Sequence, residues 1–87
     1  MARIFIPAQL REMAQGLGYV DVAGSTLGDA MFELDQRVPG IMQRLCPDGR
    51  LLPGLQISVD HAMSHRGLQA KLMENSEVHF LPLIGGG

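Results

Sequence analysis

The 87-residue sequence predicts one α+β domain, in which a single main helix packs on one face of a mixed sheet of four to five strands. Two observations carry this prediction. Short apolar or alternating segments, typical of strands, occur at both ends of the chain and in its second half. One segment between them has the apolar period of a helix. A chain of this length buries about 60–65% of its unfolded surface, which is enough for one modest core.

The first two strands are predicted near the N-terminus. Residues 3–6 form a short apolar run that Pro7 stops, and residues 19–22 form a second strand-like segment. The residues between them, 9–15, are polar and mixed, and two glycines that follow favour a loop or turn. We therefore expect the two strands to form a hairpin.

The clearest helix signal follows the second strand. Ser25 or Thr26 is a suitable N-cap, and Asp29 lies in the first turn, where its negative charge suits the helix dipole. Apolar residues recur at the spacing of one buried helix face: Leu27, Ala30, Met31, Leu34 and Val38. Pro39 and Gly40 end this helix, and a further short helical turn is expected after them.

The remaining strands are predicted in the second half of the chain. Residues 55–59 alternate apolar and polar side chains, as in a half-buried strand. Residues 60–66 are ambiguous and allow a turn with a short strand. The last strand is expected over residues 77–82, with Val78 and Phe80 on one face.

Composition and charge argue against several classes of protein. Seven basic and nine acidic residues give a net charge of -2, whereas a nucleic-acid binder normally carries a basic surface. No apolar run approaches the roughly 20 residues of a membrane helix. Cys46 is the only cysteine, which excludes an intramolecular disulfide and disfavours a cysteine-based zinc site. The N-terminus lacks a signal-peptide pattern, so we expect a cytoplasmic protein.

The chain ends in three glycines, Gly85, Gly86 and Gly87. Taken alone, such an ending is typical of a frayed terminus or a cloning artefact. These glycines, however, come directly after a strand that ends in Pro82 and two apolar residues. This setting favours a folded α+β domain over residues 1–82 with a flexible, functional C-terminal tail over residues 83–87.

Residues 74–87 contain a turn, a strand, a proline, two apolar residues and a terminal Gly-Gly. Together with residues 6–11 and 24–30, this order resembles the ThiS/MoaD family of ubiquitin-like sulfur carriers. The resemblance implies a β-grasp fold whose first and last strands are parallel neighbours. The family's usual Asp-Gly-Asp turn is Glu-Asn-Ser here, and its Asn-Gly after the third strand is Asp60-His61.

The resemblance also implies the chemistry. A ubiquitin-activating-type enzyme adenylates the last glycine with ATP, and sulfur then replaces an oxygen to give a thiocarboxylate. Here Gly87 is the reacting residue, and Gly85 and Gly86 complete a tail without side chains that can thread a narrow channel. The sequence has no Walker-type phosphate loop, so activation must come from a partner. We therefore expect a carrier and no enzyme, with no bound cofactor and with ATP used by the partner.

A partner must also recognise the domain. If Val78 and Phe80 face the helix, then alternate residues of the same strand lie on the open face of the sheet. The predicted docking residues are Phe5, His79, Leu81, Leu83 and Ile84. Gln56 and Ser58 are expected at the rim of this apolar patch.

Several alternatives remain open at this point. The acceptor of the sulfur is a synthase of the cysteine, molybdopterin or thiamine type, and in the molybdopterin case the chain is the small subunit beside a larger catalytic one. A different class is a ubiquitin-like binding or modifier module without sulfur chemistry. We expect no metal site, because His61 and His65 lie four residues apart without an obvious third ligand.

Overall fold

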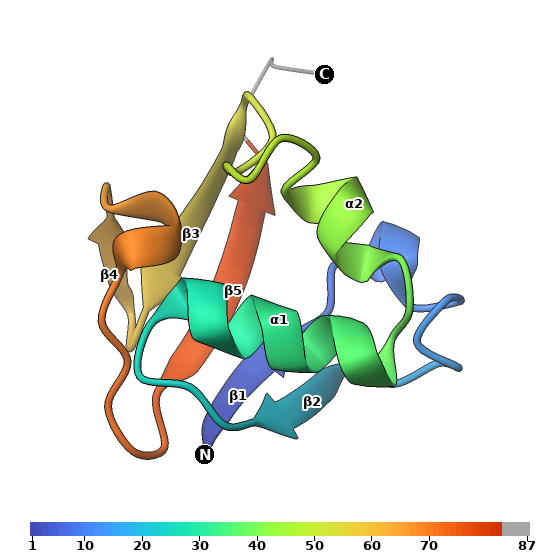
Figure 1. Cartoon of the computed structure of the whole chain (residues 1–87), viewed down its shortest axis with the longest axis horizontal. Helices are drawn as coiled ribbons and strands as arrows, with labels where there is room; N and C mark the ends of the chain where they lie inside the picture. The colour runs from blue at the N-terminus through green and yellow to red at the C-terminus, as the bar shows by residue number, and fades with distance from the viewer. Residues whose placement is uncertain (83–87) are drawn as a thin grey trace.

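The structure, a computed structural model, describes residues 1–82 with the exception of the Pro82 side chain. It contains a five-stranded mixed sheet in the order β2-β1-β5-β3-β4, with one main helix across one face (Figure 1). The strands are β1 (Ala2–Phe5), β2 (Tyr19–Val22), β3 (Leu55–Val59), β4 (Ala62–Ser64) and β5 (Glu77–Pro82). The helices are α1 (Leu27–Arg37) and α2 (Ile41–Leu45), with short 3-10 turns at Ala8–Leu10 and Gly67–Gln69. The predicted α+β class is confirmed.

The two ends of the described chain meet at the centre of the sheet. Strand β1 pairs antiparallel with β2, which confirms the predicted hairpin, and parallel with β5. On its other side β5 pairs antiparallel with β3, and β3 pairs antiparallel with β4. The parallel pairing of the first and last strands is the arrangement that the family resemblance implies.

Helix α1 begins at a side-chain cap. The hydroxyl oxygen of Thr26 accepts a hydrogen bond of 3.2 Å from the backbone N–H of Asp29, so Thr26 is the N-cap. Ser25 instead donates its hydroxyl proton to the Asp29 carboxylate at 3.4 Å. The buried face of the helix is the one that the apolar spacing predicts: Leu27, Ala30, Met31 and Leu34.

The core lies between α1 and the sheet. Alternate residues of β1, β2, β3 and β5 point into it, as the strand period requires, and each is buried: Ala2, Ile4, Val20, Val22, Ile57, Val78 and Phe80. The prediction that Val78 and Phe80 share the buried face is therefore confirmed. Within residues 1–82, every fully buried side-chain nitrogen or oxygen atom has a hydrogen-bond partner.

In two stretches the structure supplies detail beyond the sequence-based expectations. The expected loop over residues 9–15 begins with a 3-10 turn that buries Leu10 in the core, a long-range contact that local polarity does not reveal. Residues 60–66 contain the turn and the short strand that the sequence allows, and the turn joins β3 to β4 in a tight hairpin. Its two turn residues, Asp60 and His61, have φ angles of 53° and 72°, as in the two-residue turns that match the twist of a hairpin.

Candidate functional site

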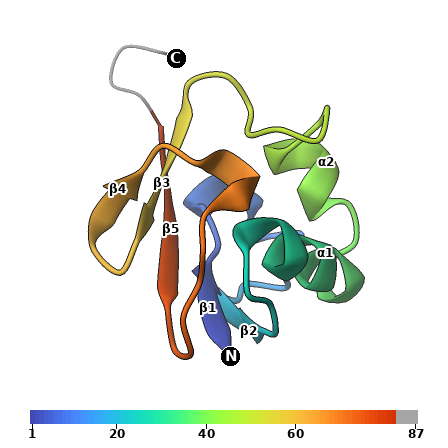
Figure 2. The same cartoon turned by 60° about the vertical axis from the view of Figure 1, so that its left-hand side comes forward.

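One face of the sheet is left open. Figure 2 shows α1 and α2 on the same side of the sheet, so within residues 1–82 the opposite side of β1 and β5 carries no helix. Because side chains alternate along a strand, the residues between the buried ones point to this open face. The sequence predicts that a partner docks here.

A row of side chains crosses the open face. The strand register aligns Tyr19 with Phe5, and Ser58 with both His79 and Met63. The rings of Phe5 and His79 are stacked with centroids 4.1 Å apart, and those of Phe5 and Tyr19 are tilted with centroids 5.8 Å apart. Residues from four strands, β2, β1, β5 and β3, with Met63 of β4 at the far edge, therefore form one continuous surface.

Leu81 extends this row toward the end of β5. It pairs with Gln56 and is 40% exposed, although it lies in a central strand of the sheet. Phe5, His79 and Leu81, the predicted docking residues within the described chain, thus share the open face. The other predicted site residues, Leu83, Ile84, Gly85, Gly86 and Gly87, lie outside the described residues.

The rim of the surface differs from the expectation. Ser58 is only 9% exposed and lies inside the row, because it is flanked by His79 and Met63 on the two adjacent strands. Sequence reasoning also missed Tyr19 and Met63, each of which is 44% exposed. The alternation of residues 19–22 was sufficient to place Tyr19 on the open face. Met63 had no such signal, because its strand has only three residues.

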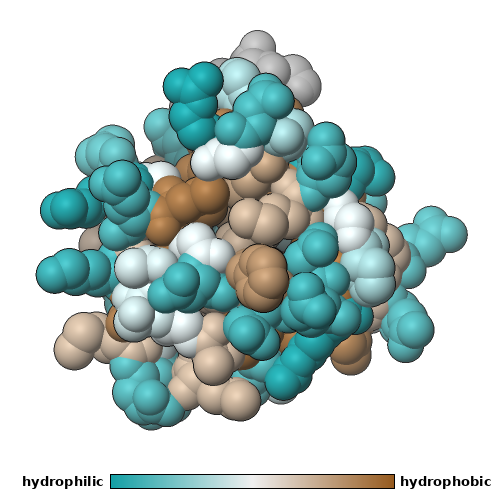
Figure 3. Space-filling model, in the orientation of Figure 1, coloured by the Kyte–Doolittle hydropathy of each residue, from teal (hydrophilic) through white to brown (hydrophobic). Residues whose placement is uncertain are grey.

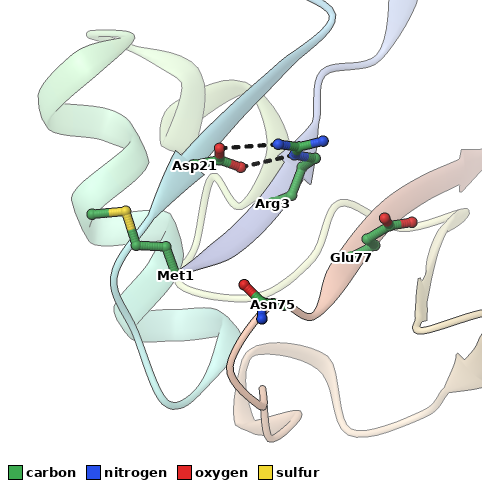
Figure 4. A pocket seen from close by; sticks show the side chains of 5 residues that line it. All are labelled: Met1, Arg3, Asp21, Asn75 and Glu77. Carbon is green, nitrogen blue, oxygen red and sulfur yellow. Dashed lines mark hydrogen bonds and ion pairs between the residues drawn. The ribbon is translucent and has the colours of Figure 1, made fainter.

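The opposite end of the open face is polar. Arg3 and Asp21 form a bidentate ion pair, in which Nε of Arg3 lies 2.9 Å from Oδ1 of Asp21 and Nη2 lies 3.3 Å from Oδ2 (Figure 4). The hydrogen bond lowers the pKa of Asp21 and raises that of Arg3. The Arg3 guanidinium also lies 3.9 Å from the centroid of the Tyr19 ring. This pair borders a shallow pocket of about 270 Å³ that Met1, Asn75 and Glu77 complete.

The open face therefore changes character along β5. It is charged where β5 begins, beside Glu77, and apolar where β5 ends, at Leu81. The apolar end is the one from which the C-terminal residues continue. A partner that binds it would lie next to the root of the tail.

The two histidines and the cysteine considered in the sequence have structural explanations. His61 and His65 are both exposed, on a hairpin turn and a loop, and residues 1–82 contain no group of three metal-ligating side chains. Burial raises the pKa of the Cys46 thiol to about 11, so this residue is a packing element. No helix within the described range is both long and apolar enough to span a membrane.

The carboxylates of Asp60 and Glu74, close to the start of β5, also stabilise the fold. The Asp60 carboxylate accepts hydrogen bonds of 2.8 Å from the backbone N–H of Glu77 and from the hydroxyl of Ser76. Glu74 pairs with the N-terminal ammonium group of Met1. Both carboxylates hold the turn that leads into β5, so they do not form a separate acidic binding site.

Comparisons with known proteins agree with this geometry. The model of the ThiS family matches residues 4–87. A chain in the crystal structure of the Amycolatopsis orientalis BexX/CysO complex is 25% identical, with a TM-score of 0.89 and complete coverage of both chains. CysO of Mycobacterium tuberculosis is 28% identical, with a TM-score of 0.86 over 95% of this chain and 99% of that one.

A third similar structure is SAMP1 from Haloferax volcanii, which is 27% identical with a TM-score of 0.72 over 99% of this chain and 98% of that one. Another crystal structure, of H. volcanii small archaeal modifier protein 1, is 26% identical with a TM-score of 0.72 over 94% of this chain and 95% of that one. A comparison with curated protein sequences finds no significant match. The structural similarities confirm the predicted β-grasp fold.

Proposed function

Because the chain belongs to the ThiS family, we propose that it is a sulfur carrier whose C-terminal Gly87 is adenylated by a partner enzyme and converted to a thiocarboxylate. The observation that carries this proposal is the extent of the family match, which includes the whole glycine tail up to Gly87. The chain itself acts as a co-substrate, and the partner supplies the catalytic groups and binds ATP.

The chemistry explains why a partner is needed. An α-carboxyl group, with a pKa of about 3.3–3.7, is ionised at neutral pH and is a poor electrophile. In the first step, an oxygen of the Gly87 carboxylate attacks the α-phosphorus of ATP, and pyrophosphate leaves. In the second step, a hydrosulfide sulfur attacks the acyl carbon, and AMP leaves with the bridging oxygen. The product is a terminal thiocarboxylate that donates its sulfur to an acceptor.

The division into domain and tail serves this reaction. Residues 83–87 span roughly 17 Å when extended, at about 3.3–3.6 Å per residue, so Gly87 can enter a site away from the domain. The absence of side chains in Gly85, Gly86 and Gly87 allows close approach to a buried nucleotide. Ordering such a tail costs about 1–2 kcal/mol per residue, which a docking surface must offset.

The docking surface in this proposal is the apolar end of the open sheet face. We name it the docking patch, and it consists of Phe5, Tyr19, Met63, His79 and Leu81. Its exposed apolar side chains lie beside the root of the tail, with Leu83 and Ile84 continuing the contact. A contiguous apolar patch of this kind is typical of a protein-binding site. The similar chain in the BexX/CysO complex supports recognition by a protein partner.

The pathway follows from the relatives only by analogy. The similarity to two CysO proteins favours an acceptor synthase of the cysteine type over the molybdopterin and thiamine types. Because the activating partner uses ATP, we place the reaction in the cytoplasm. The similarity to SAMP1 favours the alternative function, a ubiquitin-like modifier without sulfur transfer.

The mass of the intact protein tests the proposal. The chain is incubated with ATP, sulfide and a cognate adenylating enzyme, and we expect a mass gain equal to the exchange of one oxygen for one sulfur. Deletion of Gly87 provides the control and should abolish the gain. If the enzyme charges its other substrates but leaves this chain unchanged, the sulfur-carrier proposal is wrong and the modifier alternative gains support.

A further inference from the structure

A second apolar surface lies on the helix side of the sheet, close to the end of β5. It is a groove of about 400 Å³ between α2, the 3-10 turn at Ala8–Leu10 and the adjoining ends of β3 and β5. We call it the C-terminal groove and define it by Leu10, Arg44, Leu45, Leu52, Leu55 and Phe80. Figure 3 shows hydrophobic atoms at the surface in the area that Figure 1 places between α2 and the upper end of β5.

The lining of the groove suits aliphatic side chains. Leu52 is 42% exposed and Leu55 is half-buried, so both present methyl groups to solvent. Leu10, Leu45 and Phe80 are themselves buried and form the apolar floor. Leaving such a concave apolar surface in water is unfavourable, and covering it with a few methyl groups removes that cost.

The C-terminal residues continue from the rim of this groove. Pro82, the last residue of β5, pairs with Leu55, which lines the groove. The two residues that follow, Leu83 and Ile84, are the only large aliphatic ones in the tail. At about 3.3–3.6 Å per residue, Leu83 and Ile84 can lie at most roughly 7 Å from Pro82. The segment with the matching chemistry is therefore the one that starts nearest to the groove.

The charge of the groove also complements the charge of the tail. Arg44 lies in the last turn of α2, lines the groove and is exposed. Within residues 1–82 its guanidinium takes part in no ion pair. In the 87-residue chain the tail carries one anionic group, the α-carboxylate of Gly87, which follows the aliphatic pair by three residues.

We propose that the chain's own tail occupies the C-terminal groove when no partner is bound. Leu83 and Ile84 contact Leu52 and Leu55, and the Gly87 carboxylate lies beside Arg44. This resting contact keeps the tail on the helix side of the sheet, away from the docking patch on the open side. A partner must draw the tail out of the groove before it reacts. The contact itself requires no sulfur chemistry.

Nuclear magnetic resonance of the full chain with labelled methyl groups tests the apolar contact. We expect nuclear Overhauser effects from Leu83 and Ile84 to Leu52 and Leu55, unchanged when the protein is diluted tenfold. Effects that appear only between differently labelled copies would instead identify a second chain as the occupant and overturn the proposal. The complete absence of these nuclear Overhauser effects would also overturn the proposal and would favour a partner's side chain as the occupant of the groove.

A carbon-13 titration of the Gly87 carboxyl group tests the charged contact. We expect Arg44→Gln to raise its pKa by roughly 0.2–0.7 of a unit, the equivalent of an exposed ion pair. Arg66→Gln makes the same charge change at an exposed position that does not line the groove, and should leave the pKa unchanged. Equal shifts in both variants, or none in either, would exclude the contact with Arg44. Neither measurement needs an adenylating enzyme, so failure here is distinguishable from failure of the sulfur-carrier proposal.

Discussion

The rings of Phe5 and His79 stack with 12° between their planes, although the two residues lie at opposite ends of the chain. The contact exists because β1 and β5 are parallel neighbours with Ile4 aligned to Val78, which brings the next residues of both strands together on the open face. The stacked pair joins the aromatic side of the docking patch to Leu81. The arrangement of the proposed docking patch therefore depends on the central pairing of the sheet.

Leu81→Ser tests the docking patch. The substitution removes an exposed apolar side chain, worth about 1.5–2 kcal/mol when it is buried by a partner. We expect it to weaken binding to the adenylating enzyme by about 10- to 30-fold in calorimetric titration, with little change in stability. Phe32→Ser is the matched control, because Phe32 is 60% exposed on the outer side of α1. Equal weakening by both variants would mean that the open face is not the docking site.

Gly24→Ala tests the close approach between α1 and the loop that follows β2. A Cβ atom at residue 24 would lie 2.6 Å from the backbone nitrogen of Ala30 and 2.9 Å from its Cα. We expect a loss of about 1–3 kcal/mol in the free energy of unfolding, measured with urea, because helix backbone must shift. Gly18→Ala is the comparison, since a Cβ atom there meets open space, and its effect should stay within about 0.5 kcal/mol.

His61→Gly is expected to stabilise the domain. His61 has a φ of 72° in the turn between β3 and β4, and this left-handed conformation costs an L-residue about 1–2 kcal/mol. Glycine relieves that cost but loses about 0.4–1 kcal/mol through its larger entropy in the unfolded chain. The net gain should be about 0.5–1 kcal/mol in thermal or urea unfolding. His65→Gly, at a position without positive φ, should bring no gain, and a gain of the same size there would contradict this explanation.

Asp60 makes stability depend on pH. The hydrogen bond from the backbone of Glu77, with that from the Ser76 hydroxyl, lowers the pKa of Asp60. A carboxyl group whose pKa is lower in the folded state contributes stability above its unfolded pKa, and this contribution disappears as the pH falls through the folded value.

We therefore expect Asp60→Asn to cost about 1 kcal/mol at pH 7 and to cost less at pH 3, because the unfolded chain then binds a proton at Asp60 more readily than the folded domain does. Urea unfolding at pH 7, 5 and 3 measures this difference. Asp48→Asn serves as the control, because Asp48 forms no side-chain hydrogen bond within the described residues. A difference between Asp60→Asn and the unchanged protein that is constant with pH would rule out this source of the pH dependence.

Cys46 should be unreactive in the folded protein. Burial raises the pKa of its thiol to about 11, so very little thiolate exists at pH 8, and the sulfur is also covered. We expect alkylation by iodoacetamide to be at least about 100-fold slower than in urea-unfolded protein, as followed by intact mass. Similar rates in both states would show that the helix α2 region opens readily.

Much of the fold is predictable from local patterns. The bounds of β2, β3 and β5 follow from alternation, and the buried face of α1 follows from the spacing of Leu27, Ala30 and Leu34. The parallel pairing of β1 with β5 joins residues more than 70 positions apart, and no local pattern carries it. That pairing came from the family resemblance.

The candidate site was less predictable, because it also depends on pairing that no local pattern carries. Phe5, His79 and Leu81 can be assigned to the open face from strand alternation and the burial of Val78 and Phe80. The docking patch also contains Met63, whose position depends on the register of a three-residue strand set by the turn at Asp60 and His61. The short length of that strand leaves no period to detect.

The parallel alignment of β1 and β5 has a mechanical consequence. If a partner pulls on the chain at residue 82 while the domain is held at residue 2, the force runs along both strands in opposite directions. The hydrogen bonds between them are then loaded in shear and share the load, whereas an antiparallel hairpin pulled from its open end unzips one bond at a time. The domain is thus built to resist traction applied through its own C-terminal end.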